Sequence, residues 1–75
     1  MKIDYYLLGS ALQRTVAKDG RTRAEIARDA GLSVDSVSYR LIDKVYGGSM
    51  KMNTFFKICE AVNADPAELI REAER

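Results

Sequence analysis

Residues 22–46 constrain the fold more than any other stretch, because they contain the signals of two helices separated by one glycine. Thr22, followed by Glu25 three residues later, matches the capping box that marks the start of a helix. Gly31 follows the helical stretch, where a left-handed residue commonly ends a helix, and Ser33 is suited to cap the next one. These signals predict helices over residues 23–30 and 34–46.

The residues at the junction of these two helices suit a close crossing. Ala27 is small enough for two backbones to approach, and Val37 is branched enough to fill the angle between the helices. Gly31 can adopt the positive φ of a tight turn. Together they predict a helix-turn-helix, whose second helix can lie in the major groove of DNA. Alanine, glycine and valine are common residues, so a plain helical hairpin is the alternative.

The rest of the chain predicts three more helices. Asp4 and Gly20 are suited to begin and end the first, and Asp65 with Pro66 fits the start of the last. Residues 1–75 therefore form one all-α domain, a compact five-helix bundle. The expected helices span about 5–17, 23–30, 34–46, 50–62 and 66–73. The expected inward residues are Leu8, Ala11, Leu12, Thr15 and Val16 of the first helix, one of Tyr5 and Tyr6, and Met52, Phe55, Phe56, Cys59 and Val62 of the fourth.

The chain resembles the lambda-repressor-like family of DNA-binding domains, the phage repressor and Cro (XRE-type) class. The matching residues are Thr22, Ile26-Ala27, Ala30-Gly31-Leu32-Ser33, Val37-Ser38 and the stretch from Phe55 to Leu69. The resemblance covers roughly residues 7–70. It implies a compact five-helix bundle that acts as a dimer on operator DNA.

One segment departs from the family pattern. The chain has a few more residues between Val37 and Ile58 than the family has, and Arg40 stands where an inward apolar residue is usual. A third helix about one turn longer, with Leu41 and Val45 buried, explains both departures. A longer loop after a frayed helix end is the alternative.

The residue inventory argues against an enzyme. The 75 residues include one cysteine and no histidine, and they contain neither a glycine-rich phosphate loop nor an obvious carboxylate pair. We expect no catalytic residues, no cofactor and no metal. No stretch approaches the roughly 18 apolar residues of a membrane span, and the N-terminus does not match a signal peptide. We therefore expect a cytoplasmic protein; the resemblance implies that it is encoded by a bacterium or phage and associated with the nucleoid.

The charge is unevenly distributed although its net value is only +1. Residues 14–57 carry nine basic and five acidic side chains, whereas residues 58–75 carry two basic and five acidic ones. A basic middle that contains the helix-turn-helix is typical of a protein with one DNA-binding face. Ordinary solvated helix surface is the alternative explanation of the charge.

The expected DNA contacts follow from placing the third helix in the major groove. The residues expected to reach base edges are Val34, Asp35, Ser38 and Tyr39. Those expected near the DNA backbone are Thr22, Arg23, Ser33, Ser36, Arg40, Lys44 and Lys51. Arginine, asparagine and glutamine are missing from the leading positions, so direct base readout should be modest. Asp35 either accepts from a cytosine or adenine amino group or only stabilises the first turn of its helix.

These observations predict a transcriptional regulator that binds double-stranded DNA sequence-specifically. By resemblance it is a repressor or Cro-like protein of a phage or mobile element, binding a palindromic operator as a homodimer. The last helix or the Gly48–Met52 region is the expected dimer surface by resemblance, and Tyr5 and Tyr6 are further candidates. The alternative is a protein-interaction module, antirepressor- or antitoxin-like, which the low net charge and Asp35 favour.

Overall fold

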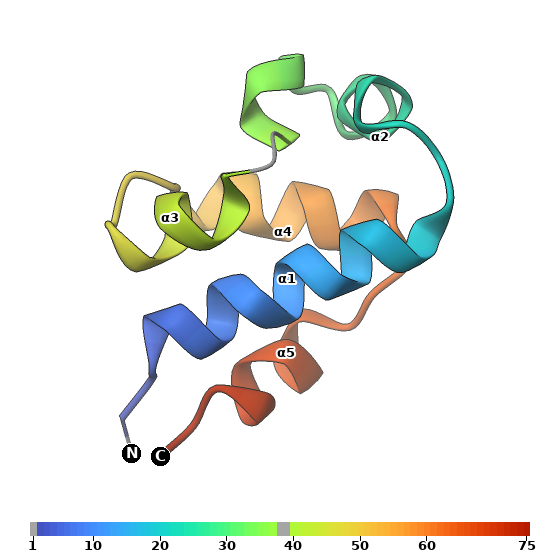
Figure 1. The fold of residues 1–75 in the computed structure, drawn as a ribbon. Helices are drawn as coiled ribbons and strands as arrows, with labels where there is room; N and C mark the ends of the chain where they lie inside the picture. The colour runs from blue at the N-terminus through green and yellow to red at the C-terminus, as the bar shows by residue number, and fades with distance from the viewer. Residues whose placement is uncertain (1, 38–39) are drawn as a thin grey trace.

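The computed structural model describes residues 2–37 and 40–75 and shows an all-α fold (Figure 1). Its elements are α1 (Tyr5–Asp19), α2 (Arg23–Ala30), the 3₁₀ turn η1 (Val34–Val37), α3 (Leu41–Tyr46), α4 (Met52–Ala61) and α5 (Pro66–Glu72). The expected all-helical class with five α-helices is confirmed. Within the described residues there is no β-strand. An isolated bridge between Ile3 and Glu74 joins the two chain ends, which lie side by side in Figure 1.

The helix ends lie where the capping residues predict them. The Asp4 carboxylate accepts from the amides of Tyr6 and Leu7, and Gly20 ends α1 with a φ of 87°. The Asp65 carboxylate accepts from the amide of Ala67 at the start of α5. The first helix extends to Asp19, slightly beyond its expected end, because Gly20 is the first residue with a left-handed backbone.

One hydrophobic core joins all of these elements. Most of the expected inward stripe of α1 is buried, whereas Thr15 is half-buried and its hydroxyl donates to the Ala11 carbonyl at 2.8 Å. The buried apolar residues are Leu8, Ala11, Leu12, Val16, Ile26, Ala27, Val37, Leu41, Val45, Phe55, Ile58, Cys59, Leu69 and Ala73. Since the core draws on every element, the helices stabilise one another by packing.

Three aromatic or sulfur-containing side chains are more exposed than expected. Tyr5 and Tyr6 are 53% and 52% exposed, so the expectation that one of them packs in the core is wrong. Met52 and Phe56 were expected on the inward face of α4, but both are about half exposed. The buried positions of α4 recur at helical spacing from Phe55 onward and include Ile58. The sequence interpretation had not placed Ile58 on the inward face of this helix.

The expected third helix over 34–46 is not continuous. Val34–Val37 form a 3₁₀ turn, and Arg40 has a φ of −99° and a ψ of 29°, outside the α-helical region. The six-residue α3 begins only at Leu41, so the expectation of a longer third helix is wrong. The break lets η1 pack on α2 while α3 packs on α1, so the two halves bury their apolar residues against different helices. Ser38 and Tyr39 lie outside the described residues.

Gly9 sets the distance between α1 and α3. A Cβ atom at this position would lie 2.8 Å from the Ile42 Cα and 3.2 Å from the Val45 Cβ. The two backbones can cross this closely only because residue 9 has no side chain. Gly9 therefore positions α3, which carries Lys44, one of the residues expected near the DNA backbone.

The described helices are all too short, or not apolar enough, to cross a membrane.

Candidate nucleic-acid interface

The corner between α2 and η1 has the tight turn that the sequence predicts. The Thr22 hydroxyl accepts from the Glu25 amide at 3.1 Å, and the Glu25 carboxylate accepts from the Thr22 amide at 2.9 Å, which confirms the capping box. The hydrogen bond from the Thr22 amide lowers the pKa of Glu25. Gly31 ends α2 with a φ of 71°, and Ala27 and Val37 are fully buried in the core. The second element of the corner is a 3₁₀ turn rather than a long helix.

The surface of η1 is open to solvent. Val34 is 56% exposed and Asp35 is also exposed, so both described residues of the expected base-reading set are accessible. The hydroxyls of Ser33 and Ser36 lie 3.1 Å apart on the same turn. The other two expected base readers, Ser38 and Tyr39, lie outside the described residues. The expected base readers that the structure describes therefore both lie on η1.

A polar hollow of about 440 Å³ lies beside η1, between this turn, α3 and the start of α4. Its lining residues are Asp35, Ser36, Lys44, Ser49, Met50, Lys51 and Thr54. The hollow thus brings one expected base reader together with three of the expected backbone contacts. The sequence interpretation missed Thr54, although its place three residues after Lys51 puts it in the first turn of α4.

Asp35 and Lys44 form an ion pair across this hollow. The Lys44 ammonium donates to the Asp35 carboxylate at 3.2 Å and also to the Asp35 backbone carbonyl. The side chain of Lys44 is only 23% exposed, whereas that of Asp35 is 91% exposed. Two residues expected to contact different parts of DNA are therefore paired with each other, and the pair links η1 to α3.

The remaining expected backbone contacts lie outside the polar hollow. Thr22 and Arg23 are at the start of α2, where Arg23 is half-buried. Arg40 lies before α3, with its Nε 3.6 Å from the Asp43 carboxylate. It lines a smaller hollow of about 230 Å³ that also contains Lys44, so it adjoins the polar hollow.

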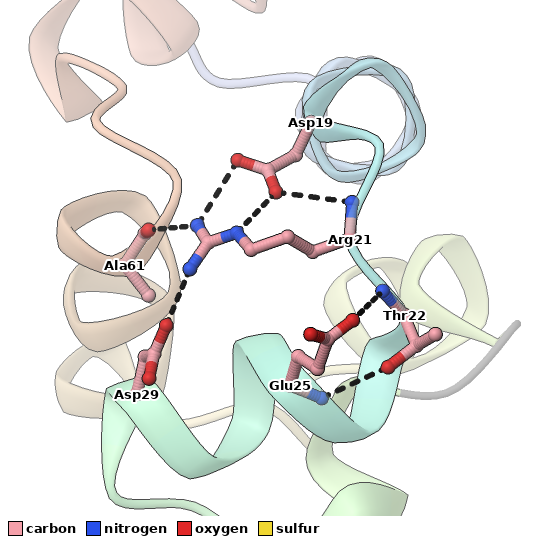
Figure 2. A network of polar contacts seen from close by, with 6 residues as sticks. All are labelled: Asp19, Arg21, Thr22, Glu25, Asp29 and Ala61. Atoms are coloured by element: carbon pink, nitrogen blue, oxygen red, sulfur yellow. Dashed lines mark hydrogen bonds and ion pairs between the residues drawn. The ribbon is translucent and has the colours of Figure 1, made fainter.

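Arg21 lies at the centre of a polar network that joins three helices (Figure 2). Its Nε lies 2.6 Å from the Asp19 carboxylate at the end of α1, and its guanidinium also donates to the Asp29 carboxylate on α2 and to the Ala61 carbonyl on α4. The hydrogen bonds from Arg21 lower the pKa of Asp19. Sequence reasoning counted Arg21 only as part of the basic middle, because nothing in the local pattern connects it with Ala61.

Cys59 is fully buried in the core. Burial raises the pKa of its thiol to about 11, so the thiol is uncharged near neutral pH. Among residues 2–37 and 40–75, no group of three or more histidine, cysteine or acidic side chains is placed to hold a metal ion. Cys59 is therefore a packing residue, as its place in the sequence predicts.

Comparison with known proteins does not extend these observations. No protein-family model, no curated protein and no solved structure matches the chain. The likeness to lambda-repressor-like domains therefore rests on the residues of this chain. Over the residues that it describes, the structure establishes a small, compact, all-helical domain with five α-helices.

Proposed function

We propose that this protein is a transcriptional regulator that binds double-stranded DNA sequence-specifically as a homodimer. The observation that carries the proposal is the exposed η1 turn beside the polar hollow, which contains Lys44 and Lys51. A repressor or Cro-like role, in which the bound dimer occupies a palindrome and blocks polymerase, is the mechanism we favour. Phage or mobile-element origin belongs to the same proposal.

The polar hollow suits a DNA phosphate. The hydroxyls of Ser36, Ser49 and Thr54 can donate to phosphate oxygens, and the Lys51 ammonium supplies positive charge. The ten-residue α4 begins at this hollow, and no side chain caps its first turn. Amides at the start of a helix favour an anion, which adds to the attraction from Lys51.

The η1 turn offers limited chemistry for reading bases. Val34 can touch a thymine methyl group, and Asp35 can accept from the amino group of cytosine or adenine. The carboxylate of Asp35 also repels phosphate when the protein is out of register. Specificity should therefore come largely from half-site spacing and DNA shape.

Selection of the purified protein on a random duplex library tests the proposal. We expect a two-fold symmetric motif with half-sites about one helical turn apart. Affinity for the selected duplex should fall steeply with added salt, because phosphate contacts release counterions. An unenriched library with only weak, salt-labile binding would contradict the proposal.

Replacing Lys51 by glutamate should weaken binding to the selected duplex by roughly ten-fold or more, because it puts an acid beside a phosphate. The slope of the logarithm of the affinity against the logarithm of the salt concentration should become shallower by about one. Lys57→Glu is the matched control, since Lys57 is also exposed, on α4, but does not line the polar hollow. Equal losses in the two variants, measured by fluorescence anisotropy, would mean that net charge alone governs binding.

Replacing Asp35 by asparagine should strengthen binding to random-sequence duplex by several-fold. The change removes an acid from the polar hollow and releases Lys44 from its ion pair, so both effects favour phosphate. Glu60→Gln makes the same charge change at an exposed residue of α4 outside that hollow. If Asp35→Asn and Glu60→Gln increase the affinity for the duplex equally, Asp35 does not lie against the DNA.

A protein-interaction module, antirepressor- or antitoxin-like, is the second candidate function. The exposed Tyr5, Tyr46 and Met52 side chains and the low net charge favour it. Lys51→Glu separates the two candidates, because it should weaken DNA binding by roughly ten-fold or more in a regulator and leave a partner complex intact. A pull-down with the wild-type and variant chains is the measurement.

A further inference from the structure

The Lys44 ammonium makes two bonds to one residue, Asp35, and these bonds differ in kind. One acceptor is the backbone carbonyl of Asp35, which belongs to η1 and is held by the fold. The other is the carboxylate, 3.2 Å away, on a side chain that is 91% exposed. The carboxylate can therefore leave Lys44 by a side-chain rotation alone, whereas the carbonyl bond stays. An ammonium has three N–H donors, so a further acceptor can join or replace the carboxylate.

The pair lowers the positive charge that the polar hollow offers to DNA. The charged residues of its lining are Asp35, Lys44 and Lys51. Because the Asp35 carboxylate lies against Lys44, it compensates the charge of that lysine, and Lys51 supplies the uncompensated charge of the lining. Lys44 therefore adds to the attraction for phosphate only when the carboxylate has moved.

We propose that Asp35 competes with DNA phosphate for Lys44, so that Lys44 contributes to binding only on duplexes that engage Asp35. This inference rests on the proposed function. When cytosine or adenine presents its amino group to η1, the carboxylate turns to that group, and Lys44 donates to a phosphate. When guanine or thymine presents acceptor oxygens there, they repel the carboxylate, which stays on Lys44.

The exposure of the two side chains suits such an exchange. Ion pairs with an exposed partner are weak, so the separation of Asp35 from Lys44 has a small cost. The side chain of Lys44 is only 23% exposed and keeps its carbonyl bond, so the ammonium remains at the hollow after the carboxylate leaves. The exchange therefore needs no movement of η1 or α3.

The consequence is a specificity that exceeds the base contact of Asp35 itself. A duplex with the wrong base loses the hydrogen bond to the carboxylate and also the phosphate contact of Lys44. Binding to other sequences is weakened by an internal competitor, which is a means of discrimination against wrong partners. Asp35 thus links the identity of a base to a contact with the DNA backbone.

A double-mutant cycle of Asp35→Asn and Lys44→Gln tests the proposal. Fluorescence anisotropy at low salt measures the affinity of each variant for the selected duplex and for random-sequence duplex. In the wild-type background, Lys44→Gln should weaken binding to the selected duplex by roughly five-fold or more, and to random-sequence duplex by less than about two-fold. In the Asp35→Asn background, Lys44→Gln should weaken binding to random-sequence duplex by roughly five-fold as well, because Lys44 is no longer compensated.

Lys51→Gln is the matched control. Lys51 lines the same hollow, but the ion pair of Asp35 is with Lys44. Its replacement should therefore weaken binding to both duplexes by similar factors, with or without Asp35. Circular dichroism establishes that the variants are folded, and Lys44→Met, which keeps an apolar stem, replaces Lys44→Gln if that variant is unfolded.

Two results would overturn the proposal: equal losses from Lys44→Gln on the two duplexes, or equal losses on random-sequence duplex with and without Asp35. If the library is enriched, either result contradicts the competition alone and leaves the proposed function in place. An unenriched library contradicts the proposed function, and the measurements on random-sequence duplex still decide whether Asp35 competes for Lys44.

Discussion

Replacing Gly9 by alanine is expected to lower the free energy of unfolding by about 2 kcal/mol, although alanine is the better helix former. Alanine in place of glycine inside a helix normally adds about 1 kcal/mol of stability. At residue 9 its Cβ would lie 2.8 Å from the Ile42 Cα and 3.1 Å from the Ile42 carbonyl oxygen. Backbone atoms cannot rotate away as a side-chain end can, so α1 and α3 must separate and the core beneath them must repack.

Thermal unfolding followed by circular dichroism measures this effect. For a domain of this size, a loss of about 2 kcal/mol corresponds to a decrease in Tm of roughly 10 °C. Gly9→Val should lower the Tm further, because its branched side chain extends further into the contact. Ser10→Ala, at a half-buried neighbour on the same helix, should leave the Tm unchanged or slightly higher. A Gly9→Ala variant as stable as the wild type would show that α1 and α3 do not cross closely.

Replacing Arg21 by alanine is expected to lower the Tm by roughly 5 to 10 °C near neutral pH. The guanidinium of Arg21 bonds to Asp19 and Asp29, and to the Ala61 carbonyl close to the end of α4 (Figure 2). Its removal leaves the half-buried Asp19 carboxylate without those donors. It also removes the polar link from α4 to α1 and α2. The Tm of Arg21→Lys should lie between those of the wild type and Arg21→Ala, because an ammonium lacks the planar guanidinium that bonds in several directions.

The effect of Arg21→Ala should depend on pH. Arg21 lowers the pKa of Asp19 below its ordinary value of 3.8, so the charged carboxylate stabilises the folded state above that value. This stabilisation is lost as the pH falls through the lower pKa of the folded protein. The difference in Tm between wild type and variant should therefore shrink below pH 3.8. Arg28→Ala, at an exposed arginine of α2, is the control and should have a much smaller effect at each pH. A difference that persists in acid would assign the role of Arg21 to packing instead.

Local signals along the sequence were sufficient to predict where most helices begin and end. Thr22 with Glu25, Gly31 and Asp65 each act within one helical turn, and the structure has them as caps at the expected places. A cap depends on backbone amides within three residues, so neighbouring residues alone determine it. The all-α class and the inward stripe of α1 follow from the same short-range periodicity.

The candidate interface was only partly predictable. Val34 and Asp35 are exposed on η1, and Ser36, Lys44 and Lys51 line one hollow. The pairing of Lys44 with Asp35 was missed, because it joins two elements that a continuous helix would have placed differently. The exposure of Tyr5 and Tyr6 was missed for a related reason: periodicity identifies an apolar residue but not whether another element covers it.

The sequence by itself determined the helical class, the caps and the tight turn after α2, because these depend on contacts within a few residues. Only the tertiary structure decided that the third helix breaks, that Gly9 sits at a backbone crossing and that Arg21 links three helices. Each of these depends on partners distant in the chain. The spacing of Val37 and Leu41 favours one continuous helix. However, η1 packs on α2 and α3 packs on α1, and the burial of apolar residues against these two helices overrides that preference.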